Sequence, residues 1–230
     1  MIAPRAATLR ILSRPARIPH RTSHVASPIT VTDIVERLTA LPSDQICCDG
    51  VSERLGDGAL DEASLRPFMN WRDDKYARNL IHRCDFFDVI LLCWQPGQVT
   101  KIHNHNGNLG WIRLVSGTMR ETNYRLPGGA TVPDLSAIEI DDDGVGHGVD
   151  LEETGQTVVA EAGTVCAVDK GRPIHKVANA STTGEKMVTL HVYSRPHDSA
   201  LAFDAEARTC QRVQFLFDTV PEGLALPNLR

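Results

Sequence analysis

The sequence predicts a mainly β domain of the β-sandwich or jelly-roll type, preceded by a short helical lead-in. Most of the chain after residue 85 consists of short runs of β-forming residues, separated by turn signals such as Pro96-Gly97, Ser116-Gly117 and Pro127-Gly128-Gly129. No helical pattern interrupts these runs. About eight short strands without intervening helices indicate a closed sandwich or jelly roll, whose interior can hold a ligand cavity.

Two helices are expected before the strands. The first begins with Thr32 as its cap and ends before Pro42, because the apolar residues between them follow helical spacing. These apolar residues are Ile34, Val35, Leu38 and Leu41. A second helix is expected over Asp61 to Met69, since it opens with two acids that favour the positive end of a helix.

The expected strands follow in order. They are Phe86 to Trp94, Trp111 to Val115, Met119 to Leu126, Thr157 to Ala160, Thr164 to Val168, Ile174 to Ala178, Met187 to Tyr193 and Gln211 to Phe217. The chain then divides into residues 1–27, a disordered basic extension or possible targeting segment, and residues 28–75, the helical lead-in. Residues 76–220 form the barrel and residues 221–230 a C-terminal tail.

Composition excludes several classes of protein. The chain has 230 residues and a net charge of −5, so nothing suggests a nucleic-acid partner, and no apolar run approaches the roughly 18 residues that cross a membrane. The six cysteines include no Cys-x-x-Cys, which favours a reducing compartment. We expect a cytoplasmic monomer. Residues 1–27 hold five arginines and no acid, as a mitochondrial transit peptide does, but prolines interrupt the helix that such a signal needs.

Three histidines are the candidate metal ligands. His103 and His105 stand two apart after a β-rich run, and His175 follows in a turn that leads into another expected strand. On a strand, a spacing of two points both imidazoles to the same face. Three converging neutral imidazoles leave a divalent ion with open positions, which is a catalytic rather than a structural arrangement. The spacing alone admits zinc, copper, iron or nickel.

The residues around these histidines resemble the two sequence motifs of the cupin family. The first motif runs from Gly97 to Gly117 and contains the His-x-His pair; the second runs from Gly163 to Asn179 and contains His175. Gly110 stands where a glutamate ligand is usual in cupins, which argues against a sugar-isomerase cupin. The resemblance implies a cupin-type barrel with the metal site inside it.

Within the cupins, the chain resembles the cysteine dioxygenase family over roughly residues 76–204. The matching segments are Tyr76-Ala-Arg78-Asn79-Leu80, Ile90-Leu91-Leu92-Cys93-Trp94, His103-x-His105, His175-x-x-x-Asn179, Leu190-His191-Val192-Tyr193-Ser194-x-Pro196 and Ala202-Phe203-Asp204. By matched position, the resemblance implies Fe(II) held by His103, His105 and His175. It also implies a reaction in which L-cysteine and dioxygen give cysteine sulfinate.

The resemblance assigns roles to the residues around the iron. Arg78 would fork onto the substrate carboxylate, with Tyr76 helping to place or screen that contact. Tyr193 would put its hydroxyl near substrate and oxygen. His191, on the same strand face, would orient that hydroxyl through a relay that includes Thr189. Relatives that prefer 3-mercaptopropionate carry glutamine at the position of Arg78, so cysteine is the favoured substrate.

Gly110 marks one departure from the animal members of the family. They carry at that position a cysteine that links covalently to the tyrosine, so Tyr193 here is expected to be a free phenol, as in bacterial members that resemble this chain. Cys93 belongs to a different strand and does not replace that cysteine. Two alternatives stay open: a dioxygenase for another small carboxylated thiol such as 3-mercaptopropionate, and a non-catalytic cupin that binds a small ligand.

Overall fold

A computed structural model describes residues 27–129, 138–168 and 173–224 of the chain. The first elements are α1 (Val31–Thr39), the 3₁₀ helix η1 (Ser43–Gln45), α2 (Cys48–Gly56) and the 3₁₀ helix η2 (Glu62–Phe68). A further 3₁₀ turn, η3 (Pro127–Gly129), lies between strands. Residues 1–26 of the expected extension and residues 225–230 of the expected tail lie outside the described residues.

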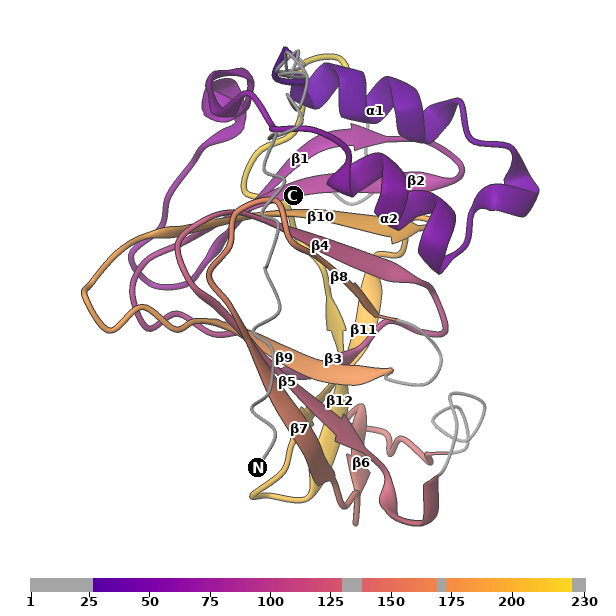
Figure 1. Ribbon diagram of the computed structural model, residues 1–230. Helices are drawn as coiled ribbons and strands as arrows, with labels where there is room; N and C mark the ends of the chain where they lie inside the picture. The colour runs from indigo at the N-terminus through magenta and orange to yellow at the C-terminus, as the bar shows by residue number, and fades with distance from the viewer. Residues whose placement is uncertain (1–26, 130–137, 169–172, 225–230) are drawn as a thin grey trace, which may run out of the picture.

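The rest of the described chain forms two antiparallel sheets that face each other (Figure 1). The strands are β1 (Ala77–Arg83), β2 (Phe87–Trp94), β3 (Ile102–Asn104), β4 (Gly110–Ser116), β5 (Met119–Arg125), β6 (Val145–His147), β7 (Glu152–Val159), β8 (Val165–Val168), β9 (Ile174–Asn179), β10 (Met187–Ser194), β11 (Ser199–Asp204) and β12 (Thr209–Gln214). One sheet has the order β1-β2-β10-β4-β8 and the other β6-β12-β11-β3-β9-β5-β7. The predicted mainly β sandwich with a helical lead-in is confirmed.

The five-stranded sheet is buried on both faces, and β2 shows why. Val89 and Leu91 pack in the core beneath α1 and α2, whereas Ile90 and Leu92 pack in the core between the two sheets. Alternate residues of a strand point to opposite faces, so a strand that is covered on both sides is apolar along most of its length, and Asp88 is the one charged residue of β2. All eight residues of β2 are buried. Figure 1 shows the two helices lying across the outer face of this sheet.

The expected cap of the first helix was wrong by two residues. Thr30, not Thr32, caps α1: the Thr30 hydroxyl accepts a hydrogen bond from the Asp33 backbone at 3.1 Å. The Asp33 carboxylate in turn accepts the Thr30 N–H at 2.7 Å. This reciprocal capping box needs an acid three residues after the cap, and Thr32 has Val35 at that place.

The second expected helix is a 3₁₀ helix, η2, and α2 was not expected at all. Asp61 caps η2 by accepting the Ala63 N–H at 3.0 Å, and Pro67 in its last turn cannot supply the N–H that an α-helix needs. The apolar periodicity of α2 is weak because only Val51 and Leu55 are buried, and Gly50 interrupts it.

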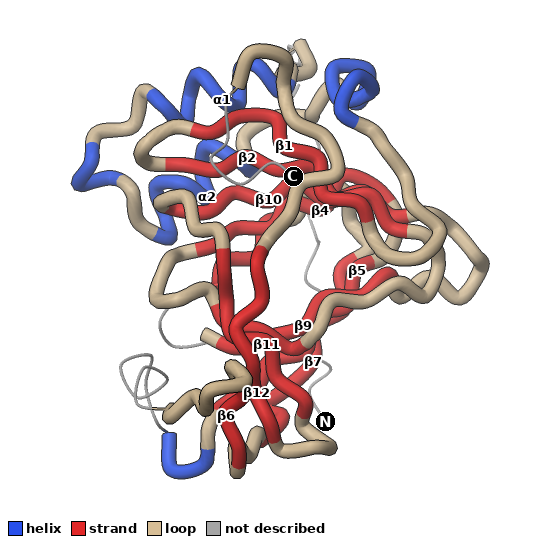
Figure 2. The backbone as a smooth tube through the Cα atoms, turned by 180° about the vertical axis from the view of Figure 1, so that it is seen from behind, coloured by secondary structure: helices blue, strands red, loops and turns tan. Residues whose placement is uncertain are grey.

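Each expected strand is present, and only two have an end that differs from the expectation by more than one residue. β7 begins at Glu152 because it lies at the edge of its sheet, where a polar, exposed strand still finds a partner in β5. β12 ends at Gln214 rather than Phe217, since the chain leaves the sheet there and runs to β1 (Figure 2). Four strands were not expected: β1, β3, β6 and β11 are either short or rich in polar or small residues.

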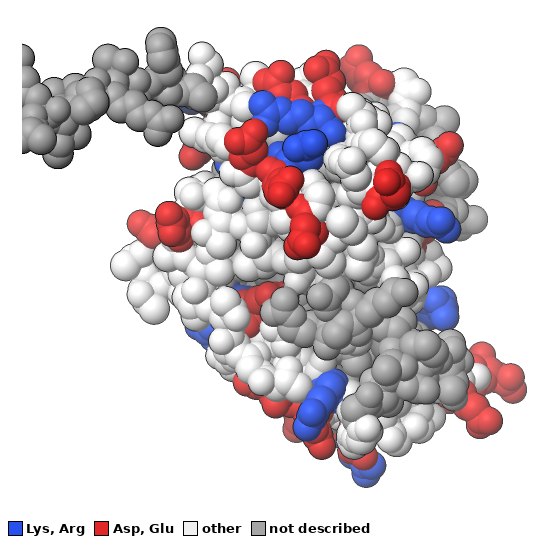
Figure 3. All heavy atoms as spheres, turned by 45° about the vertical axis from the view of Figure 1, so that its right-hand side comes forward, with Lys and Arg blue, Asp and Glu red and all other residues white. Residues whose placement is uncertain are grey.

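None of the helices in the described part of the chain has the length and apolar content that a membrane crossing requires. On the face seen in Figure 3, lysine and arginine side chains lie among acidic ones, and that face carries no extended basic area. The expected absence of a nucleic-acid partner stays a prediction.

Removing the cap of α1 tests the helix boundary. Thr30→Ala should lower the free energy of unfolding by about 1 kcal/mol, because the Asp33 N–H loses its acceptor. Chemical denaturation measures this loss. The matched control is Thr32→Ala, an exposed residue without a capping role, which should leave stability within about 0.5 kcal/mol. Equal losses in both variants would contradict the boundary.

Candidate metal centre

The three predicted metal ligands converge in the space between the sheets. His103 on β3 lies directly opposite His175 on β9 in the strand register, and His105 follows β3 in the next turn. One nitrogen from each ring lies within 4.8 Å of the others. The ring centroids are 4.9 to 5.2 Å apart. Two strands and one turn therefore bring together ligands that are far apart in the sequence.

Hydrogen bonds to two of these imidazoles leave one nitrogen of each free. The Nδ1 of His175 lies 2.7 Å from a carboxylate oxygen of buried Glu121, and the Nδ1 of His103 lies 2.9 Å from the carbonyl oxygen of Lys101. An Nδ1–H that donates to an oxygen presents the Nε2 lone pair to a metal ion. Both ring nitrogens of buried His105 lack a hydrogen-bond partner among the described residues. Such an orphaned ring fits a metal ligand.

Burial keeps the rings of His103 and His105 neutral. It lowers the pKa of His103 to about 3 and that of His105 well below its usual value, and the neighbouring His175 adds to both shifts. A metal ion needs the deprotonated imidazole, so the cluster is ready to bind one near neutral pH. Three nitrogen donors with no carboxylate ligand fit a divalent transition metal that keeps open coordination positions.

A cavity of about 400 Å³ opens onto this cluster. Its walls include His103 and His175, together with the other predicted site residues Tyr76, Arg78, His191 and Tyr193. Tyr76 stacks on Trp94, with ring centroids 4.4 Å apart. The structure thus places all the predicted binding and catalytic residues at one cavity, although their roles stay predictions.

Tyr193 ends a chain of hydrogen bonds along β10. The Trp94 indole N–H donates to the Thr189 hydroxyl at 2.9 Å, the hydroxyl lies 2.9 Å from Nε2 of His191, and Nδ1 of His191 lies 3.2 Å from the Tyr193 oxygen. The indole can only donate, which leaves the Thr189 hydrogen free to be donated to Nε2 of His191. His191 Nδ1–H then donates to the phenol oxygen. The phenol hydrogen remains available to a partner in the cavity.

The pKa values along this chain favour neutral groups. Burial raises the pKa of Tyr193, although the nearby Arg78 guanidinium acts in the opposite direction. Burial also lowers the pKa of His191 well below its usual value, and Arg78 adds to that shift. The phenol is therefore held as a neutral hydrogen-bond donor.

Arg78 presents a guanidinium without a carboxylate partner. It takes part in no ion pair among the described residues, and its buried Nε has no hydrogen-bond partner there. The nearby acids Asp88 and Asp198 both bind Arg83 instead. Arg78 is half-buried, and partial burial of a cation without an anion is costly, so this side chain is prepared for an anionic group from outside the chain.

Gly110 lies opposite Tyr193 in the strand register, in the gap between the phenol and His105. A β-carbon built at Gly110 would lie 3.3 Å from the ring atoms of both. That is closer than ordinary contact, so a side chain here would press on the predicted ligand and on the phenol. Cys93 is buried on β2 in the core beneath the helices, where burial raises its pKa to about 12.

Sequence reasoning missed two site residues. Glu121 is one of four consecutive polar residues on β5, and only the pairing of β5 with β9 places it beside His175. His197 follows β10, and its ring lies 5.0 Å from Tyr193 and 6.1 Å from His105, measured between centroids. Neither residue lies in a motif that the sequence singles out, so no local signal could have found them.

Removing the carboxylate behind His175 tests the metal centre. Glu121→Ala should weaken metal affinity about 10- to 100-fold, because His175 loses the acceptor that fixes its orientation. Competition with a coloured chelator measures this change for Fe(II) or Zn(II). Glu206→Ala, which removes an exposed acid in the turn after β11, is the control. Unchanged metal affinity in Glu121→Ala would show that this carboxylate does not support metal binding.

Comparison with known proteins shows which family the chain resembles. Residues 20–206 match the family model described as cysteine dioxygenase type I. Cysteine dioxygenase type 1 of Danio rerio is 26% identical over 198 residues, which cover 85% of this chain and 89% of the relative. The human enzyme is 25% identical over 209 residues, with coverage of 90% and 94%.

A crystal structure of a Thermus thermophilus protein matches 57% of this chain and 93% of its own length, with 19% identity and a TM-score of 0.37. That likeness is too low to support an argument about function. The family match, by contrast, spans most of the chain and includes the three histidines, Arg78 and Tyr193. This chain belongs to the cysteine dioxygenase type I family.

Proposed function

We propose that this protein is a non-haem Fe(II) dioxygenase that oxidises L-cysteine to cysteine sulfinate, with both atoms of O₂ entering the product. One observation carries the proposal: a three-histidine metal site and an unpaired arginine face the same cavity. The names of the curated relatives, cysteine dioxygenase type 1, agree with that reaction.

The ligand set supports iron and a thiol substrate. Three neutral imidazoles leave the full charge of a divalent ion uncompensated, so an anionic thiolate is a favourable further ligand. When bound, iron supplies the redox chemistry between thiolate and dioxygen, and coordination to a metal deprotonates a thiol near neutral pH. His103, His105 and His175 would hold the ion. Glu121 keeps His175 in the orientation that this requires.

Arg78 supports a substrate with a carboxylate. A guanidinium binds a carboxylate through two parallel hydrogen bonds, which fix direction as well as distance. A substrate held at its sulfur by the metal and at its carboxylate by Arg78 can no longer rotate freely, so reacting atoms stay aligned. Tyr76, which is stacked on Trp94, is a rigid wall beside this contact.

Tyr193 would donate a hydrogen bond into the cavity. We take the arrangement in which the Thr189 hydroxyl, which accepts the Trp94 N–H, donates to Nε2 of His191, so that His191 Nδ1–H occupies one lone pair of the phenol oxygen. The phenol O–H therefore points toward the cavity as a positioned donor. It can stabilise negative charge that develops on substrate or oxygen.

Two alternatives are less well supported. Another small carboxylated thiol such as 3-mercaptopropionate would use the same metal site and the same guanidinium, and the substrate comparison below separates them. A cupin that binds a ligand without turnover does not require the buried chain of hydrogen bonds that ends at Tyr193. The expected monomer, the cytoplasmic location and the domain bounds stay predictions.

Oxygen uptake by anaerobically iron-loaded protein tests the reaction. We expect uptake with L-cysteine, abolished in His175→Ala and shifted to a KM at least about tenfold higher in Arg78→Gln, because glutamine cannot form a charged bidentate pair. Faster uptake with 3-mercaptopropionate than with L-cysteine would assign a different thiol. The absence of uptake with any thiol at full iron occupancy would refute the proposed function.

Tyr193→Phe tests the hydroxyl separately from the ring. We expect kcat to fall about a hundredfold with little change in KM, since the lost O–H acts after substrate binds. The control is Tyr124→Phe, which alters another buried tyrosine, on β5 and outside the lining of this cavity. If Tyr193→Phe keeps wild-type kcat, the phenol hydroxyl has no role in the reaction.

A further inference from the structure

The guanidinium of Arg78 lies against two phenylalanine rings from the C-terminal part of the chain. Its central carbon is 4.7 Å from the ring centroid of Phe215 and 5.7 Å from that of Phe217. Both residues follow β12, and they are two apart, so they can share one face of an extended segment. A cation over an aromatic face is stabilised electrostatically. This contact uses none of its N–H donors, which can still form hydrogen bonds.

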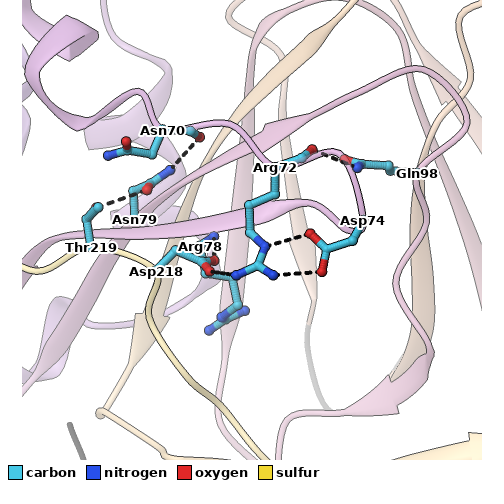
Figure 4. Close-up of polar contacts among 8 residues, drawn as sticks. All are labelled: Asn70, Arg72, Asp74, Arg78, Asn79, Gln98, Asp218 and Thr219. Atoms are coloured by element: carbon cyan, nitrogen blue, oxygen red, sulfur yellow. Dashed lines mark hydrogen bonds and ion pairs between the residues drawn. The ribbon is translucent and has the colours of Figure 1, made fainter. Parts of the chain in front are cut away.

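The same segment holds the backbone of Arg78. The Asp218 N–H donates to the Arg78 carbonyl at 2.8 Å, and the Arg78 N–H donates to the Asp218 carboxylate at 2.8 Å. Asp218 also accepts a hydrogen bond from Arg72 at 2.8 Å, and Arg72 binds Asp74 through two more. Figure 4 shows Asp218 between the backbone of Arg78 and the side chain of Arg72.

Contacts one residue further along fix the direction of the segment. The Thr219 hydroxyl donates to the Asn79 side chain at 2.9 Å, and the Leu80 N–H donates to the Thr219 carbonyl at 2.9 Å. Asn79 and Thr219 form a parallel β-bridge. Residues Phe215–Thr219, which we call the C-terminal strap, therefore run alongside the free edge of β1 (Figure 2).

The strap is also part of the cavity wall. Phe215 lines the same cavity as Arg78, His103 and Tyr193. The family match ends at residue 206, so this wall lies in the part of the chain beyond the match. Simple packing would account for a phenylalanine at this place. It would not account for a ring that lies on the guanidinium of Arg78, the arginine of the cavity lining, which has no anionic partner among the described residues.

We propose that Phe215 is a positioning residue that selects for thiols bearing a carboxylate, with Phe217 as a weaker second contact. The inference rests on the proposed function, in which Arg78 binds the substrate carboxylate. The Phe215 ring holds the guanidinium plane toward the cavity without using any of its N–H donors, and Asp218 fixes the backbone from which it extends. The strap thereby converts a flexible arginine into a preorganised carboxylate site.

Anaerobic calorimetric titration of the iron-loaded full-length protein with L-cysteine tests this proposal, and cysteamine, which lacks the carboxylate, serves as the matched ligand. Phe215→Leu should weaken L-cysteine binding about tenfold and leave cysteamine binding unchanged. Phe217→Leu should have a smaller effect, since its ring lies farther from the guanidinium. Phe215→Tyr, which keeps the aromatic face, should bind L-cysteine like the wild type.

A double-mutant cycle separates this role from packing. In an Arg78→Gln background, Phe215→Leu should cause no further loss of L-cysteine affinity, because the cation that the ring positions is gone. Phe86→Leu, at an exposed phenylalanine remote from the cavity lining, is the control for the substitution itself. Thermal melting confirms that each variant is folded before it is titrated.

The outcomes distinguish the inference from the function on which it rests. Equal losses for L-cysteine and cysteamine, or a full additional loss in the Arg78→Gln background, would overturn the role of Phe215 while leaving the reaction in place. If Phe215→Leu does not fold, Phe217→Leu carries the same comparison. If the wild type binds no carboxylated thiol, or if Arg78→Gln binds L-cysteine as the wild type does, the carboxylate contact of the proposed function fails and the inference falls with it.

Discussion

The pairing of β3 with β9 is the constraint on which the site depends. This short pairing sets His103 opposite His175, and the turn after β3 then delivers His105. Burial depresses the pKa values of His103 and His105 and keeps both imidazoles neutral, so each can offer a lone pair to a metal ion beside His175. Glu121 on the neighbouring strand β5 completes the arrangement, because it gives His175 an acceptor away from the metal position.

The two sheets supply different residues of the site. The seven-stranded sheet and the turn after β3 supply the predicted metal ligands, while the five-stranded sheet supplies Arg78 from β1 and both His191 and Tyr193 from β10. The second sheet is also buried beneath α1 and α2, so its strands are supported on both faces. A site whose parts come from two packed sheets keeps its geometry only if the sheets cannot slide, and the continuous apolar core between them provides that rigidity.

Sequence reasoning located strands whose residues are buried for packing and missed two strands whose residues line the site. The run that became β2 was readable because both of its faces are covered. β1 and β3 could not be predicted in this way, because Arg78, Asn79 and His103 interrupt their apolar pattern. These residues contact the cavity or the strap instead of packing in the core. Motif spacing still recovered the three histidines, and family resemblance recovered Arg78 and Tyr193. Glu121 and Phe215 depend on contacts between segments that are distant in the sequence, which no local pattern encodes.

Charge balance explains why one cavity would need both the three-histidine cluster and Arg78. A divalent ion on neutral ligands and an unpaired guanidinium would place two positive centres around one small cavity. Opposite charges attract more strongly in a partly buried cavity than in bulk water, so a ligand with two anionic groups is favoured over one with a single anionic group. A thiolate suits the metal because it is a soft donor, and a carboxylate suits the guanidinium because their geometries match. A small thiol with a carboxylate a few bonds away is the ligand that satisfies both centres at once.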